Sequence, residues 1–446
     1  MKKYPIIGKG FGVGIVLLFV GTSIFPLTAR DTEKPSLPTS RGDWLYVGGN
    51  GPGNYSSITA ALHNASDDDT IYVYSGIYTE GRLNINISVS LIGQSNISTI
   101  INHSTFVFNK TNIFLTEFWF QNFSQIAIYS QYGNNVCHNT VTNTIFTNIS
   151  SGITIVNSSY NTIINNHFDQ CGIFLVPSLN PFIIFTETDY FTNTILNNTV
   201  NGKPLVYLED VNDRYISDAG EIILLRCMNI TISQISFGKG ISLLECIKTT
   251  NTKIIHNDFN NTIIFLINSS ENTIADNRFY TPSGEIQANG LLLFDQCNNN
   301  NITNNVFSYQ SLIAVSMSSY NSFKHNDFYG FSFYRPIITF INADNTWQRN
   351  FWMRPRILPK LIFGYKYTTP YSNITQMSLD VDWRPALKQN NPIPNWIHNE
   401  MHIQQKMQHP WIHIASFLPL EPRFFGGTIL HKNPMLFEGI NEKLII

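Results

Sequence analysis

The 446-residue chain is poor in charge. Charged residues make up 13% of it, and the formal net charge at pH 7 is −2. Globular domains usually carry about twice that share of charged side chains, so this surface has to be wetted mainly by Asn, Ser and Thr. Proteins that bind nucleic acid present a field of Lys and Arg, and the composition supplies none. Nucleic acid is therefore not an expected partner.

Cysteine is also scarce. The five cysteines are an odd number, which excludes complete pairing within one chain, and none of them form the C-x-x-C spacing of metal sites. Cys227 and Cys297 each stand ten residues before a recurring phenylalanine, where other copies of the same pattern have serine. We therefore predict free, buried thiols packed as small side chains. The five are Cys137, Cys171, Cys227, Cys246 and Cys297.

The body of the chain lacks a persistent helical stripe. Its short apolar runs, such as residues 152–156 and 261–267, are rich in β-branched and aromatic residues and alternate with a period of two, which favours strands. What is present is an internal repeat, N-x-I-x-x-N-x-F, that returns mostly every 20 to 28 residues. Its last position is held by Phe146, Phe168, Val200, Phe237, Phe259, Phe279, Phe307, Phe328 and Trp352.

Two asparagine columns accompany the aromatic residue. The first, two positions before it, is Asn166, Asn198, Asn257, Asn277, Asn305, Asn326 and Asn350. The second, seven positions before it, is Asn139, Asn161, Asn193, Asn272, Asn300, Asn321 and Asn345. Identical side chains that recur once per turn stack in a coil of parallel strands, where Asn amides bond to the copies above and below and Asn tolerates left-handed corners. The sequence predicts an all-β parallel β-helix, a solenoid with Ile and Phe columns inside, roughly ten turns and about 50 Å long.

The start of the chain has the pattern of an export segment. Residues 1–30 begin with two lysines and continue into an apolar run broken by small residues and proline, which predicts a signal peptide or an N-terminal anchor. A polar, proline-containing linker follows over residues 31–43. We expect an exported protein at the cell surface or outside the cell, touching a membrane through this first segment alone.

One short helix is expected before the coil. Ser56 or Ser57 caps a helix whose apolar face is Ile58, Ala61 and Leu62. The acidic residues 67–69 end it, and we interpret them as a turn rather than a metal or catalytic cluster because no matching acidic pattern recurs. A helix at this place covers the open first turn of the coil. The β-helix domain is predicted over residues 44–386.

Three stretches resemble known β-helix families. Residues 55–80 resemble the start of pectin-lyase-like right-handed β-helices, and residues 197–237 are similar to the NosD-type family. Residues 354–386 resemble the end of archaeal exported members of that family. The resemblance implies a right-handed, single-stranded coil, export, and kinship with proteins of copper-enzyme maturation and with carbohydrate-active β-helices. It carries over no active site.

An enzymatic alternative has few candidate residues. The twin H-N-D-F segments place His256 with Asp258 and His325 with Asp327, but three turns separate them, about 14 Å at the usual strand spacing. That is too far for a carboxylate pair of a polysaccharide hydrolase. We assign no catalytic residue. The remaining charges Lys239, Glu245, Lys253 and Asp295 are interpreted as solvated surface groups.

The repeats stop at the extension over residues 387–446. Imidazole and thioether groups gather in it, which suits copper. The weak candidate ligands are His398, His402, Met407, His409 and His413, with Met401 nearby. The alternative is that this proline-rich segment covers the last turn of the coil.

Location, shape and the lack of catalytic signatures together favour a non-enzymatic binding or structural module, toward carbohydrate or another surface component. No cofactor is expected unless the extension holds copper. Two alternatives stay open, a copper-handling accessory protein and a polysaccharide hydrolase or lyase. About fifteen N-x-S/T sequons, Asn54 and Asn229 among them, also predict a glycoprotein where the host has the machinery.

Overall fold

The computed structural model describes residues 42–130, 136–149, 151–176, 192–238, 242–280, 289–308, 311–329, 338–341, 344–352, 357–367 and 375–391. These residues form a parallel β-helix, and α1 is the single helix among them. Within the described ranges no helix is long and apolar enough to cross a membrane. Residues 1–41, which hold the expected export segment and most of the linker, lie outside them.

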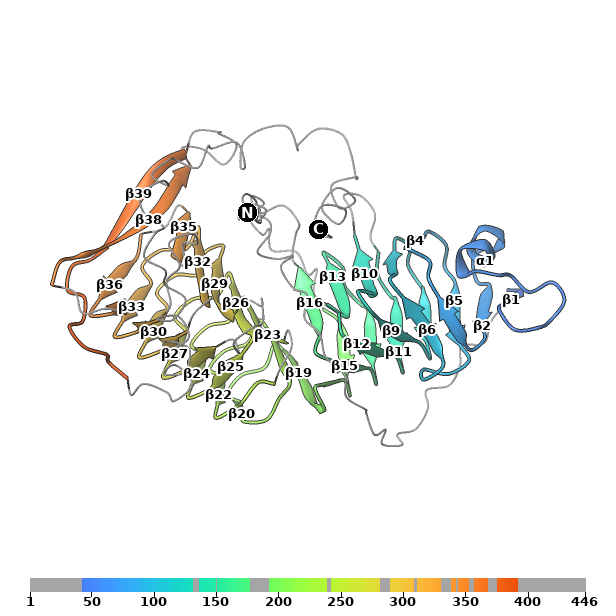
Figure 1. Ribbon diagram of the computed structural model, residues 1–446, viewed down its shortest axis with the longest axis horizontal. Helices are drawn as coiled ribbons and strands as arrows, with labels where there is room; N and C mark the ends of the chain where they lie inside the picture. The colour runs from blue at the N-terminus through green and yellow to red at the C-terminus, as the bar shows by residue number, and fades with distance from the viewer. Residues whose placement is uncertain are drawn as a thin grey trace, which may run out of the picture.

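The first part of the chain winds into a coil of three parallel sheets, here sheets A, B and C (Figure 1). Sheet A contains β1 (Trp44–Val47), β2 (Thr70–Val73), β5 (Ser90–Gly93), β8 (Phe114–Thr116), β11 (Thr140–Thr142), β14 (Thr162–Ile164) and β17 (Thr194–Leu196). Sheet B contains β3 (Gly76–Tyr78), β6 (Thr99–Asn102), β9 (Trp119–Gln121), β12 (Ile145–Thr147), β15 (His167–Asp169) and β18 (Thr199–Val200). Sheet C contains β4 (Arg82–Ile85), β7 (Thr105–Phe108), β10 (Gln125–Tyr129), β13 (Ile153–Val156) and β16 (Ile173–Val176).

The rest of the chain forms a second coil with corresponding sheets A′, B′ and C′. Sheet A′ contains β20 (Tyr215–Ile216), β22 (Thr231–Ser233), β24 (Lys253–Ile255), β27 (Thr273–Ala275), β30 (Asn301–Thr303), β33 (Ser322–Lys324), β36 (Thr346–Gln348) and β39 (Thr375–Asp382). Sheet B′ contains β25 (Asp258–Asn260), β28 (Arg278–Tyr280), β31 (Val306–Phe307), β34 (Asp327–Phe328) and β37 (Phe351–Trp352). Sheet C′ contains β19 (Lys203–Glu209), β21 (Glu221–Leu225), β23 (Ser242–Ile247), β26 (Thr262–Ile267), β29 (Asn289–Phe294), β32 (Ser311–Ser316), β35 (Ile338–Ile341) and β38 (Lys360–Tyr367).

The predicted parallel β-helix is confirmed, but it is not one uninterrupted rod, because the coil stops and restarts at the β18–β19 connection. Asn201 and Gly202 both have positive φ, 52° and 75°, and join β18 to β19 as an antiparallel hairpin. An Asn-Gly pair is the preferred two-residue hairpin turn because both positions are left-handed. Strand β19 therefore folds back on β18 and starts sheet C′ instead of adding a strand to β16. In Figure 1, β19 lies between the two coils.

The open end of the first coil packs against the outer face of sheet C′. Ile223, Ile247 and Phe265 alternate with residues that face the interior of the second coil, and they join the hydrophobic core of the first coil. The rings of Phe174 and Phe265 lie 5.9 Å apart between their centroids. We call this contact the coil junction. It buries apolar side chains that an open coil end would leave in water.

Helix α1 (Ile58–Asn64) lies at the opposite end of the first coil (Figure 1). The Ser57 hydroxyl accepts a hydrogen bond from the Ala60 N–H, so the predicted serine cap is present. The Glu80 carboxylate accepts from the N–H groups of Ile58 and Thr59, which satisfies two more donors of the first turn. Ile58 and Ala61 are buried against the first turns of the coil.

The asparagine columns run inside the corners as hydrogen-bonded ladders. In the second coil, the main-chain N–H and the side-chain amide of Asn277 both donate to Asn305 Oδ1, at 3.0 Å each. The Asn277 amide also donates to the Ile254 carbonyl at 2.8 Å. At most corners the residue before the ladder asparagine is left-handed, for example Asp276 at φ 56°. That residue makes the bend, which leaves the asparagine side chain free to point inward.

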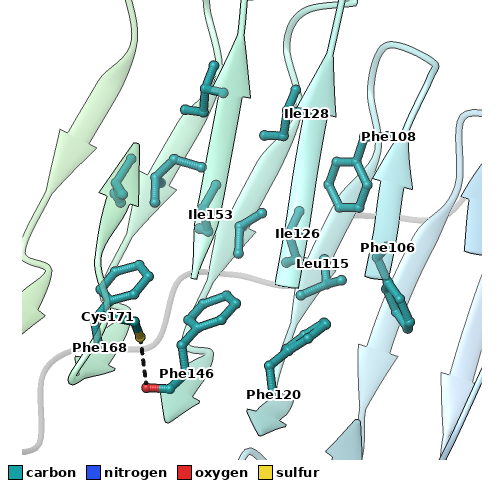
Figure 2. Packing of buried hydrophobic residues seen from close by; sticks show 14 of the residues in the cluster. Phe106, Phe108, Leu115, Phe120, Ile126, Ile128, Phe146, Ile153, Phe168 and Cys171 are labelled. Carbon is teal, nitrogen blue, oxygen red and sulfur yellow. Dashed lines mark hydrogen bonds between the residues drawn. The ribbon is translucent and has the colours of Figure 1, made fainter. Parts of the chain in front are cut away.

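The aromatic column fills the interior between the ladders. Figure 2 shows Phe120, Phe146 and Phe168 following one another along the first coil. Their ring centroids are 5.2 and 4.9 Å apart, the distance of one strand spacing. The same stacking continues from Phe237 to Trp352 in the second coil. All five cysteines are free and buried, as predicted.

Candidate functional site

The charged residues singled out in the sequence do not converge. Asp258 lies on β25 next to Arg278 on β28, and the two form an ion pair with an Nε–Oδ1 distance of 2.5 Å. Asp327 lies three strands further along sheet B′. Asp327 is not a surface carboxylate, because it is buried and its carboxylate accepts from the main-chain and side-chain amides of Asn390 and Asn391.

Two other interpretations of surface charge are wrong. Glu245 is fully buried at the coil junction, and Asp295 is 5% exposed. Period-two alternation places Glu245 on the outer face of sheet C′, but the first coil covers that face. Lys253 is exposed as expected. Lys239 and the candidate copper ligands His398, His402, Met407, His409 and His413 lie outside the described residues.

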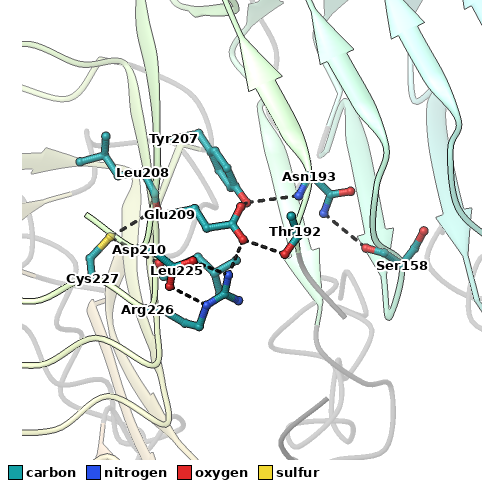
Figure 3. Close-up of polar contacts among 10 residues, drawn as sticks. All are labelled: Ser158, Thr192, Asn193, Tyr207, Leu208, Glu209, Asp210, Leu225, Arg226 and Cys227. Atoms are coloured by element: carbon teal, nitrogen blue, oxygen red, sulfur yellow. Dashed lines mark hydrogen bonds and ion pairs between the residues drawn. The ribbon is translucent and has the colours of Figure 1, made fainter. Parts of the chain in front are cut away.

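A polar network ties the two coils together beside the junction (Figure 3). The Glu209 carboxylate on β19 accepts hydrogen bonds from the Thr192 hydroxyl at 2.7 Å and the Tyr207 phenol at 2.8 Å. Arg226 also pairs with it and donates from Nε to Asp210 at 2.8 Å. Burial raises the pKa of Tyr207, so its phenol remains a donor. Every group in this network has a partner within it, which fits a structural role.

An aromatic surface is made by Trp44, Tyr46, Tyr72 and Tyr74, of which Trp44 and Tyr46 are exposed and Tyr72 and Tyr74 are half-buried. Trp44 and Tyr46 alternate along β1, and Tyr72 and Tyr74 follow the same alternation along β2 and just beyond it. Tyr46 lies directly opposite Tyr72 in the strand register. The intervening side chains, such as Val47 and Val73, point into the coil and are buried.

The four rings form one continuous patch. The ring centroids of Trp44 and Tyr46 are 6.4 Å apart and those of Tyr46 and Tyr74 are 6.3 Å apart, both pairs with nearly parallel planes. Tyr72 packs edge-on against Tyr74 at 5.2 Å. Trp44 is 46% exposed and Tyr46 is 40% exposed, although both are large and largely apolar. Aromatic residues left in water as a group mark a binding surface more often than single exposed ones do.

The surroundings hold this patch in place. Gly49 has φ +65°, and a Cβ there would lie 2.8 Å from the Tyr74 ring. The glycine-rich turn therefore packs directly against that ring. The Tyr78 phenol donates to the Tyr74 carbonyl at 2.8 Å. Asp69, just before β2, is buried, and its carboxylate accepts from the main-chain N–H groups of Asp43 and Ser66, which ties the starts of β1 and β2 together. Burial, with the neighbouring Tyr74, raises the pKa of the Tyr72 phenol.

Sequence reasoning missed this surface. The residues W-L-Y-V and I-Y-V-Y place aromatic residues at alternate positions of two adjacent expected strands. Alternation places these aromatic residues on one face of the sheet. The residues that alternate with them are aliphatic and point to the core. The signal was therefore present in the sequence, but the pairing of β1 with β2 was needed to join the two halves.

Comparisons with known proteins place the chain near no family. Scans against family models and against curated proteins give no match. Among solved structures, a GH136 lacto-N-biosidase from Eubacterium ramulus matches at 9% identity and TM-score 0.30, covering 69% of this chain and 68% of that one. The A-module of an Azotobacter vinelandii mannuronan C-5 epimerase matches at 10% and 0.27, covering 65% and 90%. The catalytic domain of a GH87 alpha-1,3-glucanase matches at 13% and 0.29, covering 71% and 67%.

At these identities and TM-scores the likeness carries no activity, substrate or partner over to this chain. The fold is assigned instead from the strand register of this chain, in which consecutive turns pair in parallel over both coils.

Proposed function

We propose that this protein is an exported, non-enzymatic module that binds a neutral polysaccharide on the aromatic surface. The observation that carries the proposal is the contiguous set of four rings on β1, on β2 and just beyond β2, of which Trp44 and Tyr46 are exposed and Tyr72 and Tyr74 are half-buried. Pyranose rings present faces of C–H bonds that pack on aromatic faces, while their hydroxyl rims hydrogen-bond to polar atoms at the ring edges. One indole and three phenols offer both kinds of contact.

The chemistry of the patch selects the class of glycan. Its four side chains offer ring faces, one indole and three phenols but no cation, and a chain of uronic acids needs basic groups to offset its charge. A neutral glycan has no such requirement. The export segment predicted over residues 1–30 would bring the protein to where such polysaccharides occur.

The test is affinity electrophoresis of the full chain through gels that contain a neutral glucan, mannan or xylan, or the acidic polymers alginate or pectate. We expect retardation by at least one neutral polymer and none by the acidic ones. Trp44→Ala is expected to weaken retention about tenfold, which corresponds to about 1.4 kcal/mol.

The matched control is Tyr320→Ala, since Tyr320 is 73% exposed on the second coil and far along the chain from the patch. It should retain wild-type binding. Equal losses in both variants, or retention by the acidic polymers alone, would overturn the proposal. Incubation of the same polymers with the wild-type protein should release no new reducing ends or unsaturated products. Such release would refute the non-enzymatic part.

A further inference from the structure

Among the residues that the structure describes, no strand covers one edge of β16, the last strand of sheet C. Strand β16 pairs with β13 on one side. In an uninterrupted coil its other edge would pair with the next turn, but β19 pairs with β18 and β21 instead. The N–H groups of Ile173 and Leu175 point from β16 toward the second coil. An edge of this kind needs acceptors when it is buried.

Two carboxyl groups of the second coil supply those acceptors. Glu221 on β21 accepts from the Ile173 N–H, with both oxygens 3.2 Å away. Glu245 on β23 accepts from the Leu175 N–H with Oε2 at 3.2 Å. A side chain at Gly172 would leave no room for this arrangement, because its Cβ would lie 2.0 Å from Glu221 Oε2. Side chains thus replace the missing strand.

The surroundings of this pair are apolar. Both glutamates are fully buried. In the sheet register Glu221 lies opposite Leu205, and Glu245 lies between Ile223 and Phe265. From the first coil they face the Cys171 thiol, with the Asp169 carboxyl close to that thiol. Across the described residues neither glutamate forms an ion pair, and Glu245 Oε1 has no hydrogen-bond partner.

Ionising such a pair is costly. Burial raises the pKa of both carboxyl groups well above the usual value, and the nearby Glu221 raises that of Glu245 further. The backbone N–H donors act in the opposite direction, but there is one donor group for each carboxyl. Two negative charges in an apolar contact with no cation are destabilising, whereas two neutral acids are tolerated.

We propose that Glu221 and Glu245 form a proton-dependent latch, which holds the two coils together when both carboxyl groups are protonated and releases the β16 edge when they ionise. The latch makes the coil junction a pH-sensitive element of the fold. It is independent of glycan binding, because the aromatic surface lies at the other end of the first coil, on β1 and β2.

The sign of the effect follows from the direction of the shift. Below the ordinary carboxyl pKa of about 4.5, the closed and open junctions both hold the protons, and closure has its full strength. Above that pH the open junction loses its protons while the closed one keeps them. Closure therefore weakens as pH rises, and it levels off once the raised pKa of the closed state is passed.

The test is hydrogen exchange of the full chain, read at the Ile173 and Leu175 amides and corrected for the intrinsic pH dependence of exchange. We expect protection to fall as pH rises from about 5 to about 8. In Glu221→Gln/Glu245→Gln the amide oxygens still accept but cannot ionise, so protection should be independent of pH. The control Glu271→Gln, an exposed glutamate of the second coil, should keep the wild-type profile.

A flat wild-type profile, or a double variant that retains the slope, would overturn the proposal. If the double variant does not fold, the infrared carbonyl band of protonated carboxyl groups in the wild-type protein decides. We expect this band to persist at neutral pH and to diminish in either single glutamine variant. Its absence from the wild-type protein at neutral pH would also refute the latch.

Discussion

Asn350 donates both its main-chain N–H and its side-chain amide to Oδ2 of Asp382, each at 3.1 Å. This is the geometry of the ladder, with aspartate in place of the next asparagine. The Trp352 indole donates to the same oxygen at 3.1 Å. Asp382 ends β39, the second strand of the antiparallel hairpin β38–β39, so the ladder finishes on the element that closes the second coil.

The first prediction concerns that closure. Asp382→Ala removes the acceptor of both Asn350 bonds, of the Trp352 indole and of the Arg384 N–H, and we expect a loss of about 3 kcal/mol in the free energy of unfolding. Asp382→Asn keeps an acceptor oxygen and should lose less than half as much. Denaturant unfolding of both variants measures this difference. Equal losses would show that the charge, not the acceptor geometry, closes the coil.

The second prediction separates the ladder residue from its neighbour. Asn277→Ala removes the acceptor of Asn257 and the donor to Ile254, all buried, and should cost about 3 kcal/mol. Asp276→Gly, one residue earlier, changes an exposed left-handed position to the residue that adopts φ 56° without strain, and should change stability by less than about 0.5 kcal/mol. Thermal melts of the two variants provide the comparison. Similar losses of stability in the two variants would contradict the separate roles of these residues, in which Asp276 makes the bend and Asn277 forms the ladder.

Much of the architecture was predictable because each turn repeats the same chemistry. The asparagine and phenylalanine positions identify one turn after another, and parallel stacking follows from their identity. The Ser57 cap was equally local. What the repeat does not encode is where it is interrupted. Asn201-Gly202 is a strong hairpin signal, but the repeats on both sides of it predict a continuous parallel coil.

Burial at the coil junction was the other feature that could not be predicted from the sequence. Glu245 occupies an alternate, outward position of its strand, and alternation alone predicts solvent there. The contact of one coil end with the side of the other is a tertiary relationship between segments 70 residues apart, as the Leu175–Glu245 bond shows. The same holds for Asp327, which is covered by Asn390 and Asn391 from beyond the predicted domain boundary at residue 386.

The third prediction tests how the aromatic surface binds. Tyr72→Phe keeps the ring and removes one phenol, so glycan affinity should fall two- to fivefold, which is about 0.4 to 1 kcal/mol. Tyr46→Ala removes a ring at the centre of the patch, in contact with Trp44, Tyr72 and Tyr74, and should lose about tenfold or more. Isothermal titration with the polymer identified by electrophoresis measures both. A larger loss for Tyr72→Phe would mean that hydrogen bonding, not ring contact, dominates.

The fourth prediction is a second, opposite pH dependence in the polar network beside the coil junction. Hydrogen bonding to the Arg226 guanidinium lowers the pKa of Asp210. A lowered pKa contributes stability that is present above the ordinary carboxyl value and is lost as pH falls through the lowered one. The contribution is small because Asp210 is 63% exposed. Acidification below about pH 4 should therefore lower the melting temperature, while the glutamate latch weakens the junction as pH rises.

Asp210→Asn should make the acid side of the melting profile shallower and leave the alkaline side unchanged, whereas Glu221→Gln/Glu245→Gln should do the reverse. Melting temperatures of the three proteins, recorded across the same pH series at constant ionic strength, separate the two contributions. Arg226 also pairs with Glu209, which accepts from Thr192 of the first coil. If the fall in melting temperature at low pH disappears in Asp210→Asn, the Asp210–Arg226 ion pair causes it. If the fall is unchanged, other carboxylates cause it.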